Sequence, residues 1–211
     1  MARAVVGVRV ARPIDAGDLV DVWVEANGED AEAAAKPDVG DDGSRAAAYD
    51  EAATAIARIE DDPDELLLLA EADGKVVGAV HLRRAPISPI QTAQAVHVSH
   101  LHVRPGHRRR GIASALLAAA TSWAEDTKST HLLATTPASS RDAHRFLARL
   151  GFCQVAVLRG VAVGPLRGRL AGGAVSSLSV ATDGLRVGGT GRLIAARRRL
   201  RRRASRDAVA G

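Results

Sequence analysis

Apolar and polar positions along the chain follow a period of two in several short stretches, which predicts β-strands. Residues 5–11 predict a first strand, and residues 95–103, rich in β-branched side chains, predict a later one. Residues 66–72 and 76–84 predict the two strands of a hairpin, because the Asp-Gly pair between them supplies the positive φ angles that tight turns need. Residues 130–136 predict a further strand.

Other stretches carry apolar residues at helical spacing. Four helices are predicted, over residues 15–26, 44–60, 111–124 and 139–150. Asp15 is expected to cap the first helix, and Gly151 to end the fourth. The inner faces of the first three helices are expected to carry Leu19, Val22, Trp23 and Ala26; Tyr49, Ala53, Ile56 and Ile59; and Ile112, Leu116, Ala119 and Trp123. Residues 27–43 are polar and acidic and predict a loop.

In chain order these elements predict an α/β fold, a mixed and largely antiparallel sheet with helices on both faces. Residues 152–163 are expected to add a strand region, so that one domain spans residues 1–163. Residues 164–211, rich in glycine and arginine, predict a basic C-terminal extension that is partly helical or disordered. Its candidate elements are a short helix over 165–171, a strand over 175–180 and a cationic amphipathic helix over 193–205.

Charge separates the two halves of the chain. Residues 1–95 contain 19 acidic and 9 basic side chains, whereas residues 96–211 contain 5 acidic and 20 basic ones. The acidic half can attract a cationic substrate such as an amine, although acidic helices also serve as ordinary solvated faces. The basic half includes a run from Arg197 to Arg203 that is interrupted only by one leucine.

A single cysteine, Cys153, excludes an internal disulfide and a zinc cluster built from cysteines. No apolar stretch reaches membrane-spanning length, and the first residues lack the layout of a secretory signal. We therefore expect a soluble cytoplasmic protein with no membrane span. His100 and His102 form only a weak pair of metal ligands, so no metal site is predicted.

The turn over residues 103–113 joins a predicted strand to a predicted helix and is rich in arginine and glycine. At a helix N-terminus the backbone N–H groups, here those of residues 109–113, have no carbonyl four residues earlier to bond, and the helix dipole favours an anion. Gly111 and Ala113 leave room for a diphosphate to approach the backbone. The turn therefore predicts a phosphate cradle, with a basic surface turn on an ordinary helix as the alternative.

Two motifs carry a family resemblance. Residues 108–113 read Arg-x-x-Gly-x-Ala, which resembles the acyl-CoA signature (Arg or Gln)-x-x-Gly-x-(Gly or Ala) of the GNAT superfamily of N-acyltransferases. Residues 140–152 read Ser-x-x-Ala-x-x-Phe-Leu-x-x-x-Gly-Phe, which is similar to the family's Asn-x-x-Ala-x-x-Phe-Tyr-x-x-x-Gly-Phe. With the opening strand and helix the resemblance covers roughly residues 5–160, and it implies a GNAT-type sheet and acetyl-CoA as co-substrate.

The resemblance also implies which residues hold acetyl-CoA. Backbone groups of Leu101, His102 and Val103 are expected to pair with the pantetheine amides as an added strand does. The diphosphate is expected on the turn, at Arg108, Arg109, Arg110, Gly111, Ile112 and Ala113. Ser140 either bonds the pantetheine arm or serves only as a helix cap.

The implied reaction is transfer of an acetyl, or another acyl, group to a primary amine by direct attack in a ternary complex. A backbone N–H near Leu101 is expected to stabilise the oxyanion. In acyltransferases of this type, the segments that correspond to residues 27–43 and Tyr49 border the acceptor site, which makes both candidates for acceptor selection.

A histidine is the expected base. His97 is the first candidate, because it lies six residues before Val103, where several GNAT members carry a catalytic Glu or His, and imidazole accepts a proton near neutral pH. Strict alternation puts Ser99 and Leu101 on the face of His97, and puts Val98, His100 and His102 on the other. His100 and His102 remain alternative bases, because a bulge would change these faces. All three histidines can also be ordinary strand residues.

The residue expected to act as the general acid departs from the family pattern. The tyrosine that often protonates the CoA thiolate corresponds to Leu147, which has no proton to give. Tyr49, Ser139 and Cys153 are weak alternative donors, and Cys153 is expected to be a small buried core residue. Water and backbone dipoles are the remaining source of help for the leaving thiolate.

A second class of function competes with the enzyme. The domain can be an acyl-CoA-binding scaffold or sensor whose tail, from Arg197 to Arg203, binds nucleic acid or an anionic surface. No aromatic side chains interleave with these arginines for base stacking, and the phosphate motif is intact, so the acetyltransferase is favoured. The oligomeric state is left open, with a homodimer as one alternative.

Overall fold

The structure, a computed structural model, describes residues 6–27 and 42–172. The chain divides into two compact units, Met1–Cys153 and Gln154–Gly211. Three predicted segments lie outside the described residues: most of the loop 27–43, the strand 175–180 and the amphipathic helix 193–205 with its arginine run.

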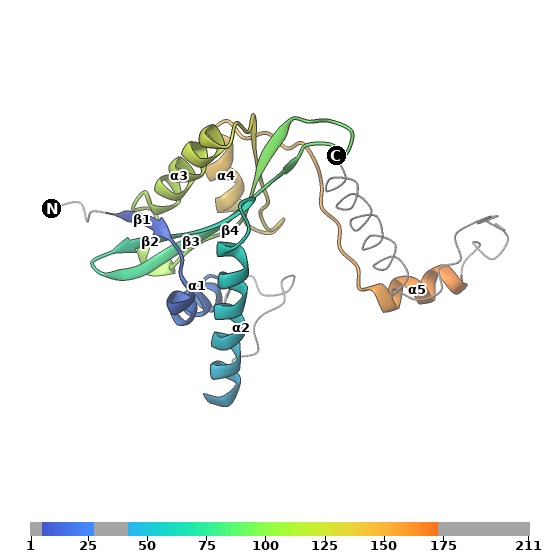
Figure 1. The fold of residues 1–211 in the computed structure, drawn as a ribbon. Coiled ribbons are helices and arrows are strands. Elements are labelled where there is room, and N and C mark those ends of the chain that lie inside the picture. Colours follow the sequence, from blue (N-terminus) through green and yellow to red (C-terminus); the bar gives the residue numbers. More distant parts are fainter. Residues whose placement is uncertain (1–5, 28–41, 173–211) are drawn as a thin grey trace, which may run out of the picture. The chain divides into compact units, whose positions relative to one another are not determined.

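The first unit is built on a five-stranded sheet in the order β1-β2-β3-β4-β5 (Figure 1). The strands are β1 (Gly7–Val10), β2 (Glu65–Ala72), β3 (Lys75–Pro86), β4 (Gln94–Val103) and β5 (His131–Ala134). The first four run antiparallel to their neighbours, and β5 runs parallel to β4. Asp73 (φ 51°) and Gly74 (φ 73°) form the hairpin turn between β2 and β3. The predicted mixed, largely antiparallel sheet is confirmed.

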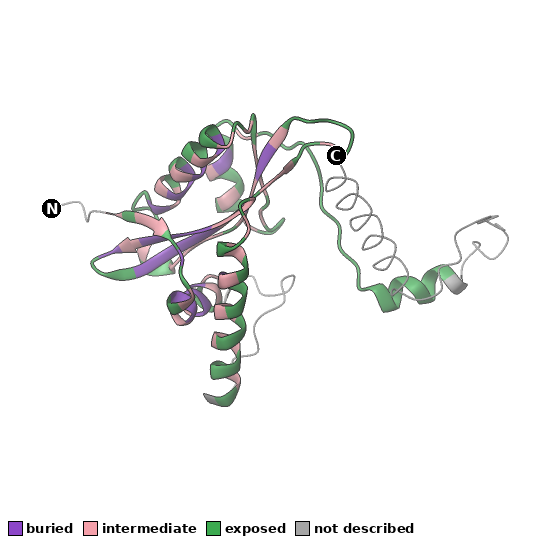
Figure 2. Cartoon of the chain, in the orientation of Figure 1, coloured by how far each residue is buried: buried purple, intermediate pink, exposed green. Residues whose placement is uncertain are grey.

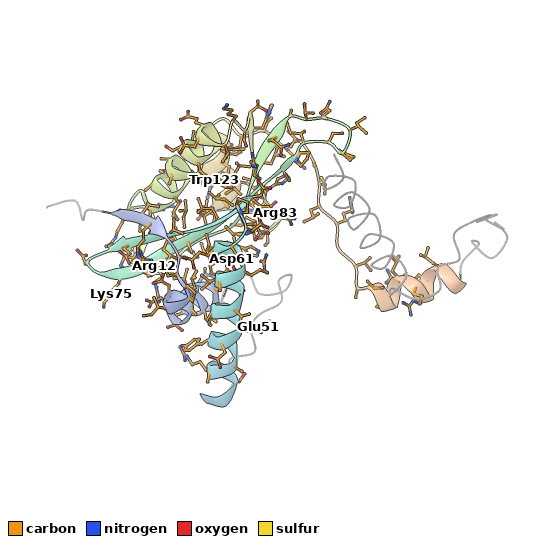
Figure 3. The ribbon with its side chains drawn as sticks, in the orientation of Figure 1. Arg12, Glu51, Asp61, Lys75, Arg83 and Trp123 are labelled. Atoms are coloured by element: carbon orange, nitrogen blue, oxygen red, sulfur yellow. The ribbon has the colours of Figure 1, made fainter. Side chains whose placement is uncertain are left out.

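Helices cover both faces of this sheet, as the sequence predicts. The helical elements of the first unit are the 3₁₀ turn η1 (Pro13–Asp15), α1 (Ala16–Asn27), α2 (Asp42–Glu60), the 3₁₀ turn η2 (Pro105–His107), α3 (Ile112–Asp126) and α4 (Arg141–Arg149). In Figure 3, Trp123 on α3 and Glu51 on α2 mark the two opposite faces. None of the helices in the described ranges is both long and apolar enough to cross a membrane.

Two apolar cores hold these layers together, and buried residues concentrate on the central strands between them (Figure 2). The first core joins the sheet to α3 and α4 and includes Val80, Leu82, Val96, Val98, Leu116 and Leu147. The second joins the sheet to α1 and α2 and includes Leu19, Val22, Ile56, Leu67, Leu69 and Ala79. Fully burying one such side chain contributes about 1.5–3 kcal/mol, so each face is anchored by several strong contacts.

Strand β4 contains a bulge at which its side chains change faces. Ser99 pairs with His81 of β3 and His102 pairs with Ala79, so the two residues between them on β4 oppose one residue of β3. One of them, His100, has φ 51°. Leu101 consequently packs against the core under α3, and His102 lies on the α1/α2 side together with Ser99. The faces predicted from strict alternation are therefore wrong beyond Ser99.

Asp15 does not cap α1, contrary to the sequence prediction. Its carboxylate accepts two hydrogen bonds of 2.7 Å from the Arg9 guanidinium and one of 2.7 Å from the backbone N–H of Arg12. It sits inside the 3₁₀ turn that precedes the helix. The Arg9 guanidinium engages both carboxylate oxygens at once, and a bidentate pair of this kind is a strong, charge-assisted interaction.

The segment after α4 also differs from expectation. Residues 152–162 form no strand and lead to the helix α5 (Val163–Gly172), which agrees with the predicted short helix over 165–171. Apolar side chains in this segment, such as Val155 and Val157, are exposed. Cys153 is exposed as well, which corrects its expected place in the core.

Candidate active site

The turn before α3 presents a row of backbone donors. Arg108 N–H donates to the carbonyl of Pro105 (3.3 Å), and the next backbone bond along the chain is that of Ala115 N–H to Gly111 (2.9 Å). Between them, the N–H groups of residues 109–114 have no acceptor among the described residues. Gly111 begins the helix with φ 86°, a left-handed conformation that glycine adopts without strain. The anion cradle stays a prediction, with free backbone donors at the place where the sequence puts it.

Arginines raise the positive potential around this turn. Asp142, at the start of α4, has its pKa lowered by a hydrogen bond from Arg145, with smaller contributions from Arg109 and Arg108. The two latter arginines belong to the turn, so the N-terminal ends of α3 and α4 lie close enough to interact electrostatically. A multiply charged anion is favoured where two helix N-termini and several guanidinium groups meet.

Strand β4 has an open edge next to the turn. β5 pairs with β4 only over the four residues that end at Val98, and the last link is the hydrogen bond from Thr135 N–H to the Val98 carbonyl (2.9 Å). Beyond that point no described strand lies beside Ser99 to Val103 on this side. Backbone groups of Leu101, His102 and Val103 therefore lie on an edge that an extended ligand can extend as an added strand.

Gly78 brings the parts of this region close together. A Cβ atom at Gly78 would lie 2.9 Å from the His102 carbonyl oxygen and 3.1 Å from a methyl carbon of Ile112. Arg104 adds a second link, because its Nε donates to the Val76 carbonyl (2.8 Å) and its guanidinium pairs with Glu25 of α1. The end of β4, the start of α3 and the end of α1 are consequently held in one arrangement.

Three aromatic rings gather where β4 bulges. The Trp23 ring on α1 lies 4.8 Å from the His102 ring and 5.6 Å from the His100 ring, centroid to centroid. Burial lowers the pKa of His102 to about 4, with His100 and Arg108 adding to the effect. Burial, and then the charge of His81, lowers the pKa of His100. Both imidazoles are therefore neutral at pH 7 and weak as bases. The Nε2 atom of His102 is buried without a hydrogen-bond partner.

A line of polar side chains crosses three strands on the α1/α2 side of the sheet. The Ser99 hydroxyl lies 3.1 Å from Nδ1 of His81, and Nε2 of His81 lies 3.4 Å from Oε2 of Glu65. The Glu65 side chain is only 7% exposed and also contacts Arg58 (3.3 Å) and Arg83 (3.7 Å). Figure 3 labels Arg83, the member of β3 that contacts Glu65.

Sequence reasoning missed this line, which we call the Glu65–His81–Ser99 line. Each member looks unremarkable within its own strand, and only the register of β2, β3 and β4 brings them together. A signal was nevertheless present, since His81 interrupts a strand that is otherwise apolar between residues 76 and 82.

The structure spreads the predicted catalytic candidates over different environments. His97 lies on the face of Ser99, paired with Arg83 on one side and Leu133 on the other. Tyr49 is engaged between α1 and α2, where it accepts a hydrogen bond from Arg45 (2.6 Å) and packs on Gly17. Leu147, in the place of the family tyrosine, is 7% exposed within the apolar core.

Two further predicted residues lie at the start of α4. Ser140 occupies the N-cap position of α4, but its side chain makes no capping hydrogen bond. Ser139 is exposed in the preceding turn.

Among residues 6–27 and 42–172, no group of three or more His, Cys, Asp or Glu side chains is arranged to hold a metal ion.

Comparison with solved structures places the fold. A transcriptional regulator from Bacillus halodurans C-125 matches with 20% identity and a TM-score of 0.59, covering 75% of this chain and 99% of that one. A ribosomal-protein-alanine N-acetyltransferase from Brucella melitensis biovar Abortus 2308 matches with 18% identity, a TM-score of 0.56 and the same coverage. An aminoglycoside N-acetyltransferase in complex with CoA matches with 14% identity and a TM-score of 0.58, covering 75% of this chain and 95% of that one.

Sequence comparison identifies the family. No curated protein is significantly similar to the chain. The model of the acetyltransferase (GNAT) family matches residues 30–152, which is more than half of the chain and contains β2 to α4, the turn before α3 and the bulge of β4. With the sheet, the open edge and the row of backbone donors in place, the chain belongs to the GNAT family of acetyltransferases.

Proposed function

We propose that the protein transfers an acetyl group from acetyl-CoA to a primary amine by direct attack in a ternary complex. The row of unpaired N–H groups at residues 109–114, beside the open edge of β4, carries this proposal. Such a row suits a diphosphate, and such an edge suits the amides of a pantetheine arm. An acetyl-CoA-dependent enzyme is also what membership of the GNAT family implies.

Each part of acetyl-CoA has a place along this surface. The diphosphate binds at residues 108–113, and the arm runs along Leu101 to Val103, with Ser140 as a further hydrogen-bonding group. The thioester then lies where β4 parts from β5, and the backbone N–H of Leu101 supplies the oxyanion donor. The thioester supplies an activated carbonyl, which the protein orients and polarises.

The acceptor amine binds on the α1/α2 side of the bulge. Neutral His100 and His102 form an uncharged aromatic wall with Trp23, and aromatic faces attract an ammonium group by about 0.5–2 kcal/mol. Similar folds acetylate an aminoglycoside or an alanine of a ribosomal protein, so both amine classes are included as acceptors. His97 is the sequence-based proposal for the base, on the same side of the sheet.

Thiol release tests the function directly. Purified protein is incubated with acetyl-CoA and a panel of amines, namely neamine, spermidine and a peptide with N-terminal alanine, and free CoA thiol is followed with a thiol reagent. We expect thiol to be released only when acetyl-CoA and an accepted amine are both present, with the N-acetylated product identified by mass. CoA binding without release for any amine would contradict the enzyme.

That last outcome is what the alternative function predicts. A binding scaffold or sensor would retain CoA affinity and would use the tail, from Arg197 to Arg203, to bind nucleic acid or an anionic surface. A salt-dependent shift of duplex DNA that disappears on deletion of residues 186–211 would support it. Membership of the GNAT acetyltransferase family favours the enzyme.

A further inference from the structure

We propose that Ser99, His81 and Glu65 form a proton relay that removes the proton from the acceptor amine. The proposal deepens the acetyltransferase function proposed above and rests on it. Ser99 is the group that meets the amine, His81 accepts the proton through Ser99, and Glu65 positions His81. The three residues come from β4, β3 and β2 and lie on the acceptor side of the sheet.

Location is the first argument. Ser99 directly follows Val98, the last residue of β4 that pairs with β5, and directly precedes the bulged residue His100. It therefore stands at the first position of the open edge, where the thioester is placed. Its side chain lies on the same face as the ring of His81, towards α1 and α2 and away from the apolar core under α3.

The hydrogen bonds define a direction for the proton. A carboxylate only accepts, so the bond to Glu65 requires His81 to carry its proton on Nε2. Nδ1 is then an acceptor, and the Ser99 hydroxyl at 3.1 Å donates to it. The Ser99 oxygen retains lone pairs that can accept a proton from an ammonium group. The line is thus polarised from the amine towards Glu65.

Charged groups surround the relay. The Glu65 side chain is nearly buried and lies between His81, Arg58 of α2 and Arg83 of β3. On β4, burial and then the charge of His81 lower the pKa of His100. His97 has the guanidinium-bearing Arg83, and not a carboxylate, as its partner on β3. A proton arriving at His81 meets a carboxylate.

The chemical step balances as follows. The ammonium form of the acceptor gives one proton to the Ser99 oxygen while Ser99 passes its hydroxyl proton to Nδ1 of His81. The freed amine nitrogen forms a bond to the thioester carbonyl carbon, and the carbon–sulfur bond breaks. The nitrogen's second proton goes to the departing CoA thiolate, and His81 later releases its proton to solvent.

The decisive variants are Ser99→Ala, Ser99→Thr and His81→Gln, measured by thiol release across pH with the best amine of the panel above. We expect Ser99→Ala and His81→Gln each to lower kcat roughly hundredfold and to remove the acid limb of the pH profile, because general bases contribute about 10²–10⁴-fold. Ser99→Thr keeps a hydroxyl and should keep the limb. The double variant Ser99→Ala/His81→Gln should lose no more than either single one, since both break one relay.

Two controls separate the relay from folding and from the proposed function. The Kd for CoA should stay unchanged in every variant, because none of the three residues lies in the cradle. If wild-type protein releases no thiol with any amine, the proposed function fails. If wild type turns over amine and Ser99→Ala keeps both rate and acid limb, the relay fails while the function stands.

A spectroscopic measurement tests the relay without turnover. Two-bond ¹⁵N–¹H spectra, with His81 assigned by its loss in His81→Gln, should show a neutral imidazole protonated on Nε2. In Glu65→Gln this preference should weaken, and the acid limb of the rate profile should move while the Kd for CoA holds. An imidazole protonated on Nδ1 in wild type, or loss of the acid limb in His97→Gln alone, would overturn the relay.

Discussion

The two faces of the sheet differ in where their polar groups lie. The face under α3 and α4 is apolar and includes Val80 on β3 and Val98 on β4. The polar groups proposed to bind the co-substrate there are backbone N–H groups at the start of α3. Under α1 and α2 the face combines an apolar core, which includes Leu67, Leu69 and Ala79, with the polar Glu65–His81–Ser99 line.

This difference separates what a family shares from what one chain adds. Backbone N–H groups exist whatever the side chains are, so a fold can hold the same co-substrate in members of very different sequence. Acceptor recognition and proton transfer need particular side chains in particular registers. The cradle proposed at the start of α3 is therefore the part that the family shares, and the relay and aromatic wall proposed on the α1/α2 face are the parts specific to this chain.

Stability should depend on the apolar parts of both faces alike. Leu116→Ala under α3 and Leu69→Ala on the other face each empty a fully buried site, and each should lower the free energy of unfolding by about 3 kcal/mol. Urea unfolding measures this, with Leu150→Ala, half exposed, as a control that costs little. A small loss at only one face would show that this face is looser than the structure indicates.

The cradle is probed most sharply at Ala113. Ala113→Glu places a carboxylate at the N-terminus of α3, where it suits the helix dipole but repels a diphosphate, and we expect the Kd for CoA to rise about hundredfold at unchanged stability. Ala118→Glu, on an exposed position of the same helix, is the matched control. Gly111 is a poorer target, because at φ 86° any side chain also strains the backbone. Equal affinities for the two variants would argue against the cradle.

Acid should weaken the α1/α2 face. Burial lowers the pKa of His102 from 6.5 to about 4, so between these pH values the unfolded chain binds a proton that the folded chain does not. Stability from this residue is complete above pH 6.5 and falls as the pH drops, by about 1–2 kcal/mol at pH 5 once partial exposure is allowed for. Urea unfolding of wild type and His102→Gln at pH 7 and pH 5 should show a shallower decline for the variant. His100 contributes in both proteins, so only the difference reports His102.

The aromatic wall should affect the acceptor and leave CoA alone. Trp23→Leu removes the ring that faces His100 and His102, and we expect the KM for the amine to rise roughly tenfold, the size of a cation–π contact. Titration with CoA should give the wild-type Kd. A parallel rise in both constants would mean that Trp23 supports β4 instead of contacting the amine.

The sequence predicted those features that depend on local pattern. Helix and strand periodicity, the Asp-Gly turn and the glycine before α3 are each readable over a few residues, and all are present in the structure. The bulge of β4 was not predicted, because one extra residue with φ 51° at His100 leaves no mark in the alternation before it. Asp15 was misread because its partner Arg9 lies outside the helix that it was expected to cap.

The candidate site follows the same division. Residues 108–113 were found from one contiguous motif, whereas the Glu65–His81–Ser99 line depends on the register of three strands. Residues 152–162 were expected to form a strand from their apolar composition, but apolar composition alone does not specify a pairing partner, and these residues form no strand. Pairing between distant segments is the information that periodicity lacks.

Gly78 gives this architecture a practical consequence. A Cβ atom at Gly78 would lie 2.9 Å from the carbonyl oxygen of His102 and 3.1 Å from Ile112, so the lack of a side chain there sets the spacing between the end of β4 and the start of α3. Efforts to retune the enzyme for new amines therefore have freedom at Trp23 and His100, but should leave this glycine untouched. A substitution at Gly78 would disturb the proposed binding regions for acetyl-CoA and for the amine together. Its effects on the binding of the two substrates could then not be separated.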